Sequence, residues 1–299
     1  MAGVCRALRR VAEEDAHVSA GPLPSMSTLL FIAVACYAFG AAHAIFALWQ
    51  APNPRWFRLA LWLMIAGFGM HTASVIARGW EVARCPLISY QEVCSFLGWA
   101  IAGYFLVAYA WYRSQAFAAF AMPMVFLFAL AAWLLPAPND TAAILKFYGQ
   151  TASLLTVHAV LFILAYAAFA ILFVAAALYI VQERQLKRKQ FGPLWSRLPS
   201  LDICDDVSAK ALVVGFALLT LGILTGILGS RRLNGVYWQG DPLEFLSLAT
   251  WLIYLCVIHY RLTAGWRGRR AAWLGIVGFA IVLASLIGIG WLNGFHVIG

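Results

Sequence analysis

Charged side chains are scarce in this sequence. Only 11% of the 299 residues are charged and 64% are hydrophobic, whereas roughly 25% of the residues of an average soluble domain are charged. A chain of this composition does not cover itself with a polar surface in water, which excludes a soluble globular protein. Because backbone polar groups in lipid must pair within their own segment, long apolar runs of such a chain are helices.

Long polar stretches are also missing between the apolar runs, which leaves no room for a soluble domain. A membrane span takes about 20 apolar residues, and eight runs qualify: 26–49, 57–78, 95–112, 116–135, 154–181, 210–229, 244–262 and 271–293. The sequence therefore predicts an all-α integral membrane protein, a bundle of about eight transmembrane helices with short loops. Residues 1–25 form a polar tail, and residues 26–299 form one membrane domain whose first helix is retained rather than cleaved.

Cysteine motifs for redox chemistry or haem attachment are absent. None of the six cysteines forms a CxxC or CxxCH motif, which excludes a thioredoxin-like protein and a c-type cytochrome. Cys85 and Cys94 lie in or beside one connector, where the sequence fits either a disulfide or two unpaired thiols. The close cluster of Cys and His that zinc needs does not occur.

Basic residues gather in alternate connectors. The connectors after the fifth and seventh runs hold Arg184, Lys187, Arg188, Lys189, Arg197, Arg261, Arg267, Arg269 and Arg270. Because Lys-rich and Arg-rich loops stay in the cytoplasm, odd-numbered connectors are predicted inside and both termini outside. The net charge of +9 follows from this bias, and no basic patch with interleaved aromatics indicates nucleic-acid binding.

Histidines fall in or at the ends of the predicted spans, apart from His17 in the tail. They are His43, His71, His158, His259 and His296. Ionisable residues inside spans are costly, so each one is a functional candidate. For any single one, hydrogen bonding to a backbone carbonyl is an equal alternative. No predicted helix holds two histidines, unlike the helices of b-type electron-transfer cytochromes.

The predicted orientation sorts these histidines by depth. His158 and His296 lie at the outer level, whereas His43 and His259 lie at the inner level. His71 lies in the outer half of the second run. Two histidines at matching depth are suited to bind one iron from opposite sides. The outer pair flanks the connector after the sixth run.

That connector, "RLNGVYWQGDPLEF", has more aromatic and charged residues than a connection between two helices needs. Tyr237 and Trp238 offer aromatic faces for stacking. Arg231 and Arg232 suit either carboxylate binding or anchoring to lipid headgroups. Asp241 followed by Pro242 is typical of a helix start.

The outward connector 79–94 is the second unusual one. Its sequence is "GWEVARCPLISYQEVC". Glu92 is predicted to cap the next helix, where the helix dipole favours an anion, with the lining of a ligand cavity as the alternative.

With these residues in place, the chain resembles the cytochrome c assembly family of integral membrane haem-handling proteins, the CcsA, CcmC and HemX type. The resemblance is carried by the segments from His71 to Trp99, from His158 to Lys189, and from Leu219 to His296. It is similar above all to the CcsA-like branch, which forms the thioether bonds of c-type cytochromes. The resemblance implies haem b as cargo, an apocytochrome with CxxCH as client, and a CcsB/ResB-type membrane partner in the bacterial inner membrane.

The resemblance also implies roles for particular residues. The family binds haem at an outward tryptophan-rich WWD segment flanked by two histidines, which correspond to His158 and His296. His259 is similar to the intramembrane histidine after that segment, and His43 or His71 would be its partner. No residue resembles a general acid or base, so whether the chain is itself the synthase subunit stays open.

The WWD segment of this chain departs from the family pattern. Asn234 and Gly240 stand where tryptophans are expected, whereas Trp238, Asp241 and Glu244 match. This depletion favours one alternative to haem presentation, a HemX-like haem-binding or regulatory protein without attachment activity. An eight-helix transporter of another solute is a second alternative, from a different class of function.

Overall fold

A computed structural model describes residues 26–49, 54–82, 85–136, 152–189, 197–265 and 267–288. These residues form helices and short connections with no strand, so the predicted all-α class is confirmed. The helices are α2 (Met26–Trp49), α3 (Pro54–Glu81), α4 (Tyr90–Tyr112), α5 (Gln115–Leu134), α7 (Ala152–Lys187), α8 (Leu201–Asn234), α9 (Pro242–Thr263) and α10 (Arg269–Gly288). All eight of these described helices are long and apolar enough to cross a membrane.

α8 extends well beyond its predicted apolar run. α8 begins at Leu201, nine residues before the predicted run, because Ser200 caps it by accepting a hydrogen bond from the Ile203 amide. The first turns of α8 stay helical although they are polar, because their carboxylates form ion pairs. Asp205 bonds Arg261 of α9 at 2.7 Å, and Asp206 bonds Lys210 at 2.8 Å.

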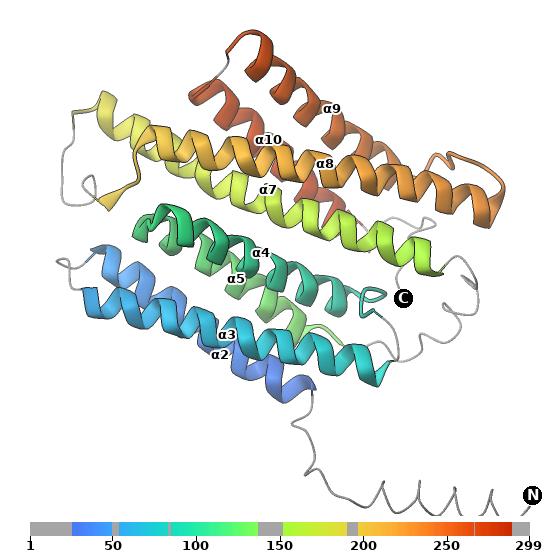
Figure 1. The fold of residues 1–299 in the computed structure, drawn as a ribbon, viewed down its shortest axis with the longest axis horizontal. Coiled ribbons are helices and arrows are strands. Elements are labelled where there is room, and N and C mark those ends of the chain that lie inside the picture. Colours follow the sequence, from blue (N-terminus) through green and yellow to red (C-terminus); the bar gives the residue numbers. More distant parts are fainter. Residues whose placement is uncertain are drawn as a thin grey trace, which may run out of the picture.

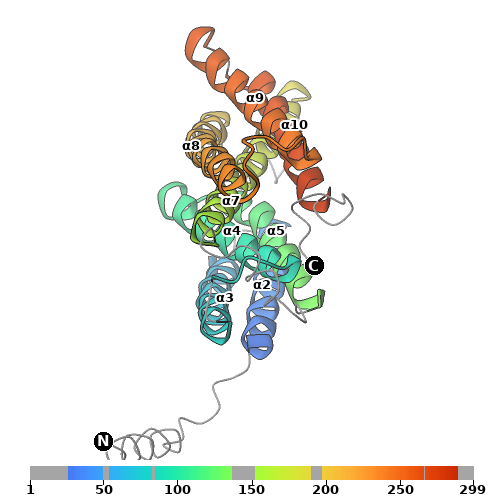
Figure 2. The same ribbon diagram turned by 90° about the vertical axis from the view of Figure 1, so that its right-hand side faces the viewer.

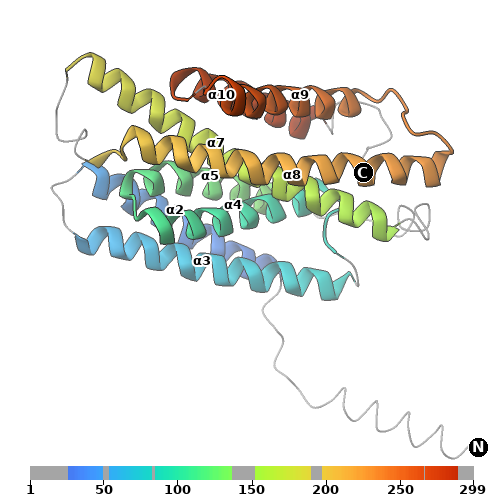
Figure 3. The same ribbon diagram turned by 45° about the horizontal axis from the view of Figure 1, so that its top comes forward.

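The helices lie as four stacked pairs. Figures 1 and 3 show α2 with α3 on one side, then α4 with α5, then α7 with α8, and α9 with α10 on the far side. The end-on view in Figure 2 shows the same order. The α3–α4 and α8–α9 connections and the start of α7 lie at one end of the bundle (Figure 1), which we call the loop end.

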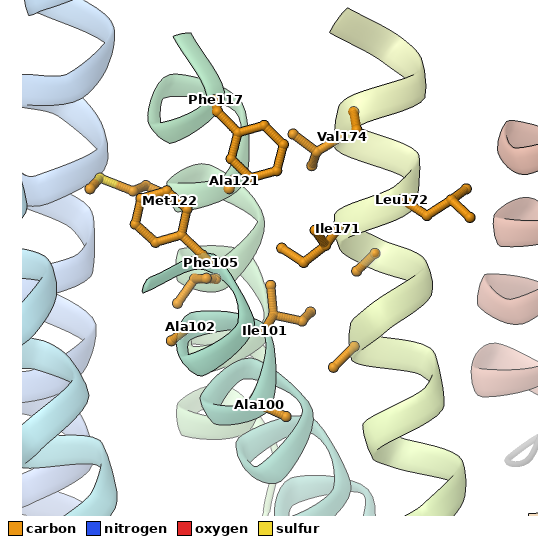
Figure 4. Packing of buried hydrophobic residues seen from close by; sticks show 14 of the residues in the cluster. Ala100, Ile101, Ala102, Phe105, Phe117, Ala121, Met122, Ile171, Leu172 and Val174 are labelled. Carbon is orange, nitrogen blue, oxygen red and sulfur yellow. The ribbon is translucent and has the colours of Figure 1, made fainter. Parts of the chain in front are cut away.

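α7 is the central helix of this stack. Its membrane window is 67% buried, more than that of any other described helix. On one side, Ile171 and Val174 of α7 face Ile101 of α4 and Phe117 of α5 (Figure 4). α7 also buries several alanines, and small residues let neighbouring backbones approach closely, as is common between membrane helices.

The described helices divide into two halves with the same packing pattern, α2–α5 and α7–α10. In each half the first helix packs most extensively on the second, it also contacts the fourth, and the second packs less on the third than on the first. Corresponding helices of the two halves run in the same direction (Figure 1). This is the arrangement of a parallel internal repeat.

Matching side-chain contacts support the repeat. In the first half, the Trp99 indole donates to Thr72 Oγ1 at 2.8 Å and stacks on Phe68. In the second half, the Trp251 indole donates to Thr220 Oγ1 at 2.9 Å and stacks on Phe216. Both threonines follow the sequence pattern GFxxxT.

Glycines on α8 set how closely α8 approaches α7. A Cβ on Gly215 would lie 2.5 Å from the Phe169 ring, and one on Gly222 would lie 2.6 Å from the Phe162 ring. A glycine inside a helix costs about 0.5–1 kcal/mol relative to alanine. The packing of aromatic rings into these gaps offsets that cost and makes α7 and α8 the most extensively packed pair.

We therefore expect Gly215→Ala to lower the stability of the protein by about 1–3 kcal/mol through overpacking. Gly69→Ala is the matched control, because a Cβ at Gly69 meets no atom within 4 Å. Thermal unfolding in detergent should show a lower Tm for Gly215→Ala and an unchanged or slightly higher Tm for Gly69→Ala. Equal Tm values for the two variants would contradict this account of the α7–α8 contact.

Candidate functional site

The α8–α9 connection is short and sharply shaped. α8 ends where Gly235 adopts a left-handed conformation with φ of 76° and its amide bonds the Arg231 carbonyl. Gly240 has φ of 77°, a second position that side chains other than glycine rarely adopt. The loop therefore turns back at two glycines and presents residues 236–239 at the loop end.

The carboxylate of Glu244 holds this loop in place. Its Oε2 accepts hydrogen bonds from the backbone amides of Gln239, Gly240 and Asp241 at 3.0, 2.9 and 3.3 Å. Asp241 in turn caps α9 by accepting from the Leu243 amide at 2.8 Å, with Pro242 in the first turn. The predicted helix start at Asp241 and Pro242 is confirmed.

A second set of bonds ties the loop to the end of α8. Ser230 Oγ donates to the Val236 carbonyl at 2.9 Å, and Gln239 Nε2 donates to Ser230 Oγ at 3.1 Å. Together with Glu244, these bonds satisfy the polar groups at the base of the loop and leave its aromatic side chains outside.

The aromatic side chains of the loop are exposed. Tyr237 is 59% exposed and Trp238 41%. The Arg231 guanidinium lies 5.1 Å from the centre of the Tyr237 ring, and Trp238 meets Phe245 edge to face at 5.3 Å. Arg232, the next residue of α8, is also exposed. The loop thus carries two flat faces and two cations at one end of the bundle.

His158 lies near the start of α7, at the same end (Figure 1). Its Nδ1 is 2.9 Å from the Gly222 carbonyl oxygen of α8. A carbonyl only accepts, so Nδ1 carries the proton and Nε2 is the nitrogen with the lone pair. The ring packs on Phe162 at 4.7 Å. His296, its predicted partner, lies outside the described residues.

The inner-level histidines are not brought together. His43 lies on α2, where its Nδ1 donates to the Phe39 carbonyl at 2.7 Å and its ring lies 5.7 Å from Trp56. His259 is exposed on α9 against Tyr260. α2 and α9 lie on opposite sides of the bundle (Figure 2). Their pairing on one iron stays a prediction.

His71 has a different setting. It is fully buried, with Nε2 3.0 Å from Ser95 Oγ and Nδ1 3.4 Å from the Tyr37 hydroxyl. Both ring nitrogens are therefore engaged within the first half of the molecule. These contacts favour a structural role and set His71 apart from His259.

Glu92 anchors the α3–α4 connection as Glu244 anchors the α8–α9 loop. It forms a capping box with Ser89, which confirms the predicted cap, and its Oε1 accepts from Arg78 Nε at 3.0 Å. Glu92 also lines a small pocket with Arg78 and Ser95. Cys94 is a free thiol, so it forms no disulfide with Cys85. Within the described part of the chain, no three His, Cys, Asp or Glu side chains gather as a metal site.

Sequence reasoning missed the partners of the site residues. Arg78 carries no motif that marks it as the partner of Glu92, and Gly222 acts through its backbone carbonyl, which leaves no mark in the sequence. The recurrence of glycine at positions 215, 222, 226 and 229 was the one available signal, since it indicates a close helix contact.

Removing the carboxylate of Glu244 should release the α8–α9 loop. Glu244→Ala leaves three amides without their acceptor, a loss of about 1–3 kcal/mol for each amide that stays buried. Amide hydrogen exchange of residues 235–241 should speed up in this variant and less so in Glu244→Gln, which keeps one acceptor oxygen. Ser247→Ala, one turn further along α9, is the control. Unchanged exchange in Glu244→Ala would contradict the anchoring role.

Comparison with known proteins places this geometry in a family. The cytochrome c assembly protein family matches residues 87–296. The cytochrome c biogenesis protein CcsA of Synechococcus sp. (strain CC9902) is 32% identical over 252 residues, covering 76% of this chain and 82% of that protein. CcsA of Synechococcus sp. (strain CC9605) is 30% identical over 254 residues, covering 77% and 83%.

A solved structure shares the fold. The cytochrome c haem lyase CcmF superposes with a TM-score of 0.67 at 19% identity, over 90% of this chain and 48% of that one. This chain thus spans about half the length of CcmF. Because the family match extends over most of the sequence and includes the α8–α9 loop, the chain belongs to the cytochrome c assembly protein family.

Proposed function

We propose that this protein acts in cytochrome c biogenesis, where it binds haem b at the loop end and presents it for covalent attachment to apocytochromes with a CxxCH motif. The observation that carries the proposal is the hydrogen bond from His158 Nδ1 to the Gly222 carbonyl. Histidines that bind metals commonly donate their other ring N–H to a carbonyl in this way, which fixes the ring and its tautomer. His296 is the proposed second ligand.

The loop suits the rest of the haem molecule. Haem is a flat apolar ring with two propionates, and the exposed rings of Tyr237 and Trp238 offer it stacking surfaces. Arg232 and Arg231 offer cations for the propionates, with Arg231 already held over Tyr237. Asp241 contributes by capping α9 and so fixing the loop, rather than by touching the ring.

The attachment chemistry belongs to the haem and the client. Each cysteine thiol adds across a vinyl group: a carbon–sulfur bond forms, the thiol proton goes to the other vinyl carbon, and no net oxidation occurs. The residues of this chain would hold the ring and orient it toward the client, which is catalysis by positioning. We assign no acid or base to the chain. A CcsB/ResB-type membrane protein is the proposed partner in the synthase.

The predicted orientation fits this role. The basic last turns of α7 and α9 lie at the end of the bundle opposite the α8–α9 loop (Figure 1). By the positive-inside rule they face the cytoplasm, so the loop faces the outside of the bacterial inner membrane. For a second haem site we propose His259, and His43 in preference to His71, because His43 uses only Nδ1 in its bond to Phe39.

A HemX-like protein that binds haem without attaching it is the second candidate. The loop itself favours it, because Gly240 replaces an expected tryptophan and its positive φ shapes the turn. A tryptophan at this position would be strained. The loop is therefore built without that ring, and the aromatic surface is smaller than in the family pattern.

An absorption spectrum of the detergent-purified protein tests haem binding. We expect a Soret band in the wild type that is lost, or shifted to that of a singly ligated haem, in His158→Ala and in His296→Ala. His17→Ala, in the polar tail, should match the wild type. A colourless protein, or a spectrum indifferent to His158 and His296, would overturn the proposal and favour a transporter of another solute.

Co-expression with a CxxCH reporter and a CcsB/ResB-type partner separates the two haem-binding candidates. Attachment predicts covalent haem on the reporter, detected by haem staining after denaturing electrophoresis, and its loss in His158→Ala. Haem-loaded protein without covalent reporter haem above background would support the HemX-like function instead.

A further inference from the structure

The ring of His158 occupies a gap in the surface of α8. A Cβ on Gly226 would lie 2.7 Å from both Cε1 and Nδ1 of His158, and 3.7 Å from Nε2. Contacts below 3.0 Å are not tolerated between such atoms, so any larger residue at position 226 displaces the ring. The absence of a side chain at Gly226 is therefore what allows the Nδ1–Cε1 edge of the His158 ring to lie against α8.

The same stretch of α8 sets the tautomer of the ring. The Gly222 carbonyl accepts from His158 Nδ1 at 2.9 Å, and it also accepts from Thr225 Oγ1 at 2.8 Å. Thr225 Oγ1 lies 3.0 Å from the Leu221 carbonyl as well. The threonine hydroxyl and the imidazole N–H thus share one acceptor oxygen, and sharing weakens each of the two bonds.

The internal repeat shows that this gap is specific to the second half. The pattern GFxxxT aligns Gly67 with Gly215, and in that register Arg78 of α3 corresponds to Gly226 of α8. Arg78 extends a long side chain that pairs with Glu92 at 3.0 Å. The α3–α4 hairpin thus has a paired arginine at this position, whereas the α8–α9 hairpin has no side chain there and leaves room for His158 of α7.

We propose that Gly222, Thr225 and Gly226 are positioning residues that hold His158 with Nε2 as its iron-binding nitrogen. The inference rests on the proposed function and adds how the ligand is oriented and tuned. The carbonyl of Gly222 fixes the proton on Nδ1 and raises the basicity of the imidazole, and Thr225 moderates that effect. Gly226 supplies the space.

Gly226→Ala tests whether the gap at Gly226 orients the His158 ring. We expect haem affinity to fall about 10–100-fold, the magnitude typical for loss of a contact that orients a metal ligand, together with a changed Soret band. Gly215→Ala is the matched control, because it introduces a similar clash with an aromatic ring at about 16 Å along the helix. It should lower Tm yet keep the wild-type spectrum and affinity. Equal spectral changes in both variants, or none in Gly226→Ala, would overturn the proposal.

Thr225→Val tests whether the Thr225 hydroxyl affects the hydrogen bond between His158 and the Gly222 carbonyl. This substitution keeps the shape of the side chain and removes its hydroxyl, so the His158 N–H bond to Gly222 should strengthen. A more basic imidazole stabilises ferric iron, so the reduction potential of the bound haem should fall while Tm stays close to the wild type. Thr225→Ser keeps a hydroxyl and should restore the wild-type potential. A potential indifferent to the hydroxyl would remove Thr225 from the proposal.

A haem-free measurement separates this inference from the proposed function. Nitrogen-15 NMR of protein with labelled histidine, assigned by comparison with His158→Asn, should report a single tautomer protonated at Nδ1. Gly226→Ala should show mixed tautomers. If the protein never binds haem but these spectra are as expected, the proposed function fails and the positioning stands. A ring protonated at Nε2 in the wild type would overturn the positioning itself.

Discussion

The close approach of α7 and α8 is the contact on which the candidate site depends. Glycines on α8 leave gaps that aromatic rings from α7 fill, and His158 fills the gap at Gly226. The same approach brings the Gly222 carbonyl within hydrogen-bond distance of the ring. One packing arrangement thus provides both the stability of the most extensively packed helix pair and the orientation of the proposed ligand.

The two halves of the molecule share the same anchoring contacts, but only the second half leaves an exposed aromatic loop. Each half anchors a connection at the loop end with the carboxylate of a capping glutamate, Glu92 or Glu244, and each locks its hairpin with a tryptophan-to-threonine bond. In the first half, the Glu92 carboxylate accepts from the Ile88 and Ser89 amides and also pairs with the Arg78 guanidinium. In the second half, the Glu244 carboxylate accepts from the amides of its own loop, and that loop stays exposed with its aromatic rings outward.

The sequence predicted those features that depend on composition along the chain. Apolar runs located the spans, and Asp241 with Pro242 marked the start of α9, because both signals are local. The polar start of α8 was missed, since its stability comes from the pairing of Asp205 with Arg261. The bond between His158 and Gly222 joins residues 64 apart through a backbone atom, and no pattern of side chains reveals it. The sequence paired His43 with His259 only because both lie at the inner level of the membrane. Their positions around the bundle depend on how the helices are ordered in space, which depth does not reveal (Figure 2).

A cryo-electron microscopy map of the haem-loaded protein tests the central claim most directly. The account predicts haem against Tyr237 and Trp238 at the loop end, with iron bound by His158 Nε2 while Nδ1 keeps its bond to the Gly222 carbonyl. Haem bound elsewhere with the His158 ring unengaged, or iron on Nδ1 with the carbonyl bond broken, would contradict it.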